Sequence, residues 1–89
     1  MIINVKHKKK HQITLDLRCA QIRYLKNVDK KGKILFERME SSDIEAYTFL
    51  WEHDKPALLR SLAKDVQECY FGIAVKVADL EIIEGAKVL

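Results

Sequence analysis

Apolar and polar residues alternate along the first part of the chain with the period of two that half-buried β-strands require. Over 12–18 the odd-numbered positions are apolar, whereas over 20–24 the even-numbered positions are apolar. A strand cannot change its buried face without a bulge or a turn, so the pattern predicts a break near 19–21. One helix over about 15–25 is a second interpretation that fits the spacing of the apolar residues.

Two basic stretches separate the predicted strands. Residues 7–11 read His-Lys-Lys-Lys-His, and we expect this wholly polar segment to form a loop between strands over 2–6 and 12–18. Residues 27–33 are predicted to form a turn, which leads into a further strand over 34–39.

The clearest helical pattern lies in the second half of the chain. Pro56 suits the first turn of a helix, with Asp54 or Lys55 at the cap, and Gly72 suits its end. The apolar residues recur at i, i+3, i+4 and i+7, the spacing of a single buried stripe: Leu58, Leu59, Leu62, Ala63, Val66, Cys69 and Tyr70. The sequence therefore predicts an amphipathic helix over about 56–70.

The segments on either side of that helix have less decisive patterns. Ser42 and Glu45 fit a capping box, which favours a helix. The aromatic and β-branched residues that follow favour a strand, and we expect a central strand over 43–52. Residues 73–78 alternate and are expected to form another strand, extended by apolar residues within 80–83.

Together these elements predict an α+β fold, in which an antiparallel sheet of four to six strands carries the helix on one face. The 89 residues suit one small domain over 1–89, with a short C-terminal tail from about 84. No apolar run approaches the ~18–20 residues that span a bilayer. The first apolar residues precede the basic cluster, the reverse of a signal peptide. We therefore expect a soluble, cytoplasmic domain without a membrane partner.

Charge is distributed unevenly along the chain. Residues 1–33 contain ten Lys or Arg and two Asp, a net charge of +8, whereas residues 34–89 have a net charge of −5. Such asymmetry is typical of proteins with an anionic partner, usually nucleic acid. If the strands form a meander, the two basic loops emerge at the same end of the sheet. Six lysines would then share that end: Lys8, Lys9, Lys10, Lys30, Lys31 and Lys33. If 12–26 is one bulged strand, the two loops lie at opposite ends.

Other candidate chemistry is weaker. His7 and His11 have the spacing of two zinc ligands on a helix, but three lysines lie between them, and we expect no bound metal. Cys69, His53 and Asp54 are the one conceivable set of a nucleophile, a base and an orienting acid. The chain has no Gly-rich phosphate loop, and we expect no enzyme activity, cofactor or small-molecule substrate.

The cysteines and aromatic residues lie in apolar segments. We expect Cys19 and Cys69 to be reduced residues of the core, because a small secreted domain usually has several disulfides. Aromatic side chains can stack on bases, but we expect these to belong to the core: Tyr24, Tyr47, Phe49, Trp51 and Tyr70.

These observations predict a small, non-catalytic module that binds nucleic acid or regulates a process on it. Lysine outnumbers arginine in the basic loops, which favours contacts with phosphates over the reading of bases, so binding should be largely independent of sequence. The alternative is a protein–protein interaction or self-assembly module without a nucleic-acid role. Its basis is the 48% hydrophobic content and the tendency of open strand edges to pair, which suit a homodimer.

Overall fold

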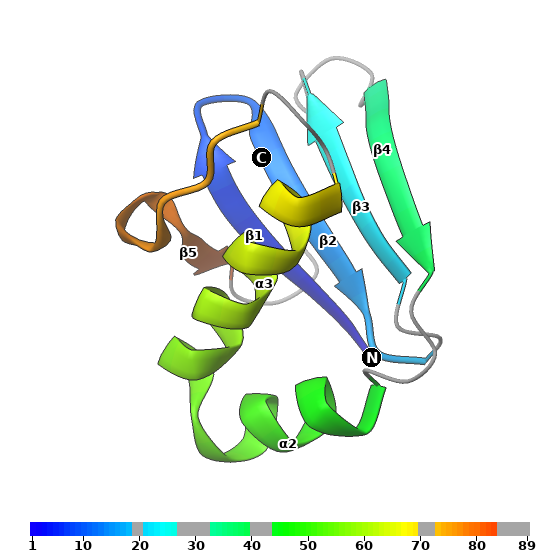
Figure 1. Cartoon of the computed structure of the whole chain (residues 1–89), viewed down its shortest axis with the longest axis vertical. Helices are drawn as coiled ribbons and strands as arrows, with labels where there is room; N and C mark the ends of the chain where they lie inside the picture. Colours follow the sequence, from blue (N-terminus) through cyan, green and yellow to red (C-terminus); the bar gives the residue numbers. More distant parts are fainter. Residues whose placement is uncertain (19–20, 27–32, 40–43, 70–72, 84–89) are drawn as a thin grey trace.

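A computed structural model describes residues 1–18, 21–26, 33–39, 44–69 and 73–83; over 33–39 and at Cys69 it describes the backbone alone (Figure 1). The elements, in chain order, are β1 (Ile2–Lys8), β2 (His11–Asp16), β3 (Gln21–Lys26), β4 (Lys33–Met39), α2 (Ile44–His53), α3 (Lys55–Cys69), the 3-10 helix η2 (Val77–Asp79) and β5 (Glu81–Ile83). The predicted α+β fold class is confirmed.

The five strands form one antiparallel sheet in the order β4-β3-β2-β1-β5. The first four strands are a meander, and the chain returns at its end to place β5 beside β1 (Figure 1). The meander interpretation is therefore confirmed, and the alternatives of one helix over 15–25 or one bulged strand over 12–26 are wrong.

The change of apolar phase has a simple origin in the pairing of β2 with β3. Ile13 faces Tyr24 and Leu15 faces Ile22, so each pair joins an odd to an even position on the same side of the sheet. The apolar set must therefore change from odd to even where the chain turns back.

Asp16 supports the end of β2. Its carboxylate accepts hydrogen bonds from the Arg18 backbone N–H at 3.0 Å and from the guanidinium Nε and Nη2 at 2.9 and 2.7 Å. The side-chain hydrogen bonds from Arg18 lower the pKa of Asp16 to about 2. The Arg18 side chain is largely exposed, so we attribute little stability to this ion pair.

One face of the sheet and α3 form the core (Figure 1). The sheet contributes Ile3, Val5, Ile13, Leu15, Ile22 and Tyr24, Leu17 follows directly after β2, and α3 contributes Leu58, Leu62, Ala63 and Val66. The predicted amphipathic helix is thus confirmed. It begins as expected, because the Asp54 side chain accepts a hydrogen bond from the Ala57 N–H at 3.1 Å, the geometry of an N-cap. Gly72, its expected end, lies outside the described residues.

The prediction of a central strand over 43–52 is wrong, because most of this segment is α2. A central strand buries both faces, whereas α2 buries Tyr47, partly buries Leu50 and Trp51, and leaves Phe49 59% exposed. The Thr48 hydroxyl is accommodated in the helix by donating a hydrogen bond to the Ile44 carbonyl at 2.7 Å. The capping-box signal was therefore the informative one.

The expected strand over 73–78 is also wrong. Val75 donates its N–H to the Gln67 side chain of α3 at 2.9 Å, so its backbone bonds the helix instead of a neighbouring strand. The 3-10 helix η2 follows, and the strand forms later, as β5.

Some predictions concern residues that the structure describes only in part or not at all. Cys19, Tyr70 and the expected tail from 84 lie outside the described residues, as does the side chain of Cys69. Of the other aromatic residues expected in the core, Tyr24 and Tyr47 are buried, Trp51 is half-buried and Phe49 is exposed. Within the described part of the chain, no helix has the length and apolar character needed to cross a membrane.

Candidate functional site

The sheet register brings the β1–β2 turn and the paired ends of β3 and β4 to one end of the molecule. Lys9 and Lys10 form the turn between β1 and β2, and Lys26 at the end of β3 pairs with Lys33 at the start of β4. His11 pairs with both Lys8 and Lys26, which places the turn beside the end of β3. We call this surface the lysine end and define it by five residues: Lys8, Lys9, Lys10, Lys26 and Lys33.

The lysine end contains four of the six lysines expected there. Lys30 and Lys31 lie outside the described residues, and Lys33 is placed by its backbone alone. Lys26 was not predicted, although it comes directly before the second basic loop in the sequence. The β1–β2 turn lies at the opposite end of the molecule from α2 (Figure 1).

The β1–β2 turn is tighter than the predicted five-residue loop. β1 continues through Lys8 and β2 begins at His11, so only two residues connect them. Lys9 is exposed and Lys10 is partly exposed. Lys10 has φ 67°, a left-handed conformation that costs a residue with a Cβ about 1–2 kcal/mol and suits glycine better.

His7 is the clearest departure from the predicted loop, because it is part of β1 and only 3% exposed. It alternates with Ile3 and Val5 toward the core. Its Nδ1 lies 2.7 Å from the Tyr24 hydroxyl, and the Nδ1 of half-buried His11 lies 2.9 Å from the same oxygen. We call these three residues the His–Tyr–His cluster.

The rings of the His–Tyr–His cluster also pack edge to face. The Tyr24 ring centroid lies 5.6 Å from that of His7 and 5.8 Å from that of His11, at steep interplanar angles. Aromatic rings favour this geometry because the positive edge of one meets the negative face of another. The cluster therefore holds both imidazoles in fixed orientations beneath the lysine end.

Burial shifts the pKa of each side chain in the cluster in the direction that disfavours its charged form. It raises the pKa of Tyr24 to about 12. Burial first, and then the nearby charge of Lys8, lowers the pKa of His7 against the opposing effect of Asp79. Burial, Lys26 and Lys8 lower the pKa of His11. At neutral pH the positive charge of this end therefore comes from its lysines, with both imidazoles neutral.

The two histidines do not have the arrangement expected of zinc ligands on a helix, because they lie on adjacent strands and both direct Nδ1 at a phenol. Within the described part of the chain, no three His, Cys, Asp or Glu side chains are grouped closely enough to hold a metal ion. The other candidate set is dispersed, since His53 and Asp54 precede α3 whereas Cys69 is its last residue.

A second polar cluster, which the sequence did not reveal, lies on the other side of the sheet. Gln12 is 2% exposed, and its amide nitrogen donates to Asn4 Oδ1 at 2.9 Å and to Thr14 Oγ1 at 3.1 Å. Thr14 in turn donates to Asn4 Oδ1 at 3.1 Å. The two bonds to Asn4 join β1 to β2, and we interpret the cluster as a device that fixes their register.

No protein-family model, curated protein or solved structure matches this chain. The chemistry of the lysine end is therefore the basis for a functional proposal.

Proposed function

We propose that this protein is a small cytoplasmic, non-catalytic module that binds the phosphate backbone of nucleic acid through its lysine end. The observation that supports it is the sheet register, which gathers lysines from two separate connections at one end. Duplex DNA presents one negative charge per roughly 1.7 Å of axis, so a compact group of lysines can contact several phosphates together.

The chemistry of the charged groups favours binding that is independent of sequence. Lysine ammonium groups act as point charges toward phosphates, whereas bidentate reading of guanine is typical of arginine. The described arginines nearest in sequence lie away from the lysine end: Arg18 is held by Asp16, and Arg23 pairs in mid-strand with Thr14 and Glu37.

The direct test is the affinity for labelled single- and double-stranded oligonucleotides between about 50 and 200 mM salt. The slope of log K against log salt should be about −0.9 per phosphate contacted on duplex DNA and about −0.7 on a single strand. Replacing Lys8, Lys9 and Lys10 by Gln should make the slope shallower by up to about three contacts. Binding should weaken equally for every sequence, because phosphates carry no sequence information.

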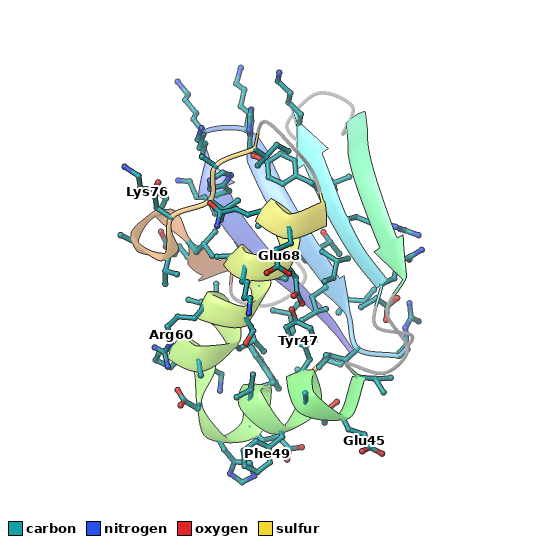
Figure 2. The ribbon with its side chains drawn as sticks, viewed as in Figure 1. Glu45, Tyr47, Phe49, Arg60, Glu68 and Lys76 are labelled. Carbon is teal, nitrogen blue, oxygen red and sulfur yellow. The ribbon has the colours of Figure 1, made fainter. Side chains whose placement is uncertain are left out.

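A matched control separates position from net charge. Replacing Lys55, Arg60 and Lys64 by Gln also removes three positive charges, but these exposed residues belong to α3. Arg60 projects from the outer side of that helix (Figure 2). The control variant should bind nearly as wild type. Equal loss in both variants, or wild-type affinity weaker than ~10⁻⁴ M at low salt, would overturn the proposal.

Self-assembly is the second candidate function. β4 is an outer strand of the sheet, and such edges are templates for pairing with another chain. On α2, exposed Phe49 lies one turn from both Glu45 and Glu52, and Figure 2 shows Phe49 and Glu45 pointing away from the molecule. Light scattering tests it: a homodimer has twice the 10.4 kDa mass of the chain, and a single-chain mass at high concentration would exclude it.

A further inference from the structure

We propose that His11 is a further phosphate-binding residue and that binding at the lysine end takes up one proton on its imidazole. This inference rests on the proposed function and adds a regulation to it: affinity for a polyanion rises as the pH falls. Four observations carry it, namely the position of His11, the hydrogen bonds of the His–Tyr–His cluster, the burial of His7 and the surrounding charges.

His11 lies among the lysines. It follows Lys10 directly and is paired in the sheet with Lys8 on one side and Lys26 on the other. The His11 side chain is half-buried, whereas His7 is only 3% exposed. A charge on His11 would therefore add to the surface that a phosphate approaches.

The single proton of the Tyr24 hydroxyl limits how the cluster can be bonded. The hydroxyl can donate to only one Nδ1, so the other imidazole must donate its own Nδ1–H to the phenol oxygen. In the tautomer that has His11 as this donor, the His11 Nε2 has a free lone pair. Adding a proton at Nε2 then leaves both hydrogen bonds of the cluster intact.

His7 cannot accept a proton so easily. When its Nδ1 accepts the Tyr24 hydrogen, a proton added there displaces that hydrogen, and the hydroxyl must then find another acceptor. Its Nε2 is buried, with no hydrogen-bond partner among the described residues. A charge on His7 would be costly in this position. Because His7 is 3% exposed and His11 is half-buried, His11 is the imidazole of the cluster that can take up a proton beside a phosphate.

The neighbouring charges make that proton depend on the ligand. From the described elements, Lys8 of β1 and Lys26 of β3 act against a charge on His11, while Asp79 of η2 acts on His7. A phosphate bound at the lysine end neutralises the two lysines and attracts an imidazolium. By linkage, whatever raises the proton affinity of His11 on binding must raise the phosphate affinity on protonation by the same factor.

The test is the affinity for oligothymidylate, whose bases do not titrate in the relevant range, from about pH 8 to about pH 5 at constant ionic strength. Wild type should bind about fivefold more tightly at the acidic limit, the factor expected from one further unit charge about 4 Å from a phosphate in water. His11→Asn, whose amide can replace Nδ1 beside Tyr24, should bind as wild type at the alkaline limit and show no pH dependence.

His53→Asn is the matched control, because His53 is an exposed imidazole at the end of α2, and this variant should retain the full pH dependence. NMR titration of the wild-type His11 ring gives a second measurement that needs no variant: its pKa should rise when oligothymidylate is bound. Salt-dependent binding with no pH dependence, or an unchanged His11 pKa, would overturn the inference and leave the proposed function standing. Absence of binding at every pH would overturn both.

Discussion

In the His–Tyr–His cluster, one hydroxyl is the hydrogen-bond partner of two imidazoles. Removal of the Tyr24 hydroxyl would therefore affect both histidines. Both Nδ1 atoms lie within 2.9 Å of this oxygen. Because His7 is almost fully buried, loss of the hydroxyl would leave its Nδ1 without water or another described partner. An unpaired buried polar group is expensive, since it has given up its hydration.

We expect Tyr24→Phe to lower the free energy of unfolding by about 1–3 kcal/mol in urea denaturation. Tyr47→Phe makes the same chemical change at a hydroxyl that donates to Asp65 at 2.5 Å. Asp65 is half-buried and can reach water, so this control should lose less. Equal losses would show that burial of the imidazoles does not set the cost.

Replacement of Lys10 by Gly is expected to increase stability and to weaken oligonucleotide binding. Lys10→Gly removes the Cβ from a left-handed position and should raise the free energy of unfolding by about 1 kcal/mol. The same change removes one charge from the lysine end and should weaken oligonucleotide binding. Lys9→Gly, at the exposed neighbour, should weaken binding without that gain in stability. A Lys10→Gly variant that is more stable and also binds as wild type would exclude Lys10 from the interface.

For single residues, the sequence predicts the exposure of the lysines correctly but does not predict the burial of His7. Lys8, Lys9 and Lys10 reach the surface as expected, because ammonium groups stay in water. His7 is buried in β1, although the run of polar residues that begins with it predicts an exposed loop. A neutral imidazole can enter a core when a hydroxyl from another strand meets it, and a partner seventeen residues away leaves no local signal.

Among the elements, α3 shows close agreement between its apolar pattern and the burial of its described side chains. Its stripe places Leu58, Leu62 and Val66 with no exposed surface against the sheet. Only a helix gives this spacing one face, so the pattern had one interpretation.

We expect Leu62→Ala to lower the free energy of unfolding by about 2–5 kcal/mol through loss of burial and creation of a cavity. Lys64→Ala, on the exposed side of the same helix, should change it by less than about 0.5 kcal/mol, since Lys64 is exposed and its ion pair with Glu68 is long, at 3.9 Å. A loss below about 1 kcal/mol for Leu62→Ala in a urea melt would contradict the burial of this stripe.

The other helix shows why the sequence could not settle every element. The residues of α2 are apolar on most sides, and such a pattern fits a central strand as well as a short helix. What decides it is that the segment lies at one end of the molecule, with Tyr47 turned inward and Phe49 outward. That position is a property of the tertiary structure, which the apolar pattern of the segment does not encode.

For the whole molecule, the titrations predict two steps of acid destabilisation. The pKa values of His7 and His11 are lowered from 6.5 in the folded state, so the unfolded chain binds protons first as the pH falls below that value. The free energy of unfolding must then decrease with falling pH. Asp16 adds a smaller second decrease between about pH 4 and its folded pKa of about 2, because solvent screens its pairing with the exposed Arg18 side chain.

Urea midpoints across this pH range should reveal both steps. Asp16→Asn should remove the second and keep the first, and bound oligonucleotide should reduce the first by holding a proton on His11. A midpoint that stays constant from about pH 7 to about pH 5 would contradict the lowered pKa values of the two histidines.

The pairing of β5 with β1 has a consequence for synthesis of the chain on the ribosome. The meander from β1 to β4 can form once the chain has been synthesised through Met39. The outer edge of β1, however, is covered by Glu81–Ile83, which are synthesised much later. At roughly 5–20 residues per second, that edge stays open for several seconds while α2 and α3 are translated. A message that ends before β5 would yield a nearly complete sheet with an open strand, which is a template for aggregation.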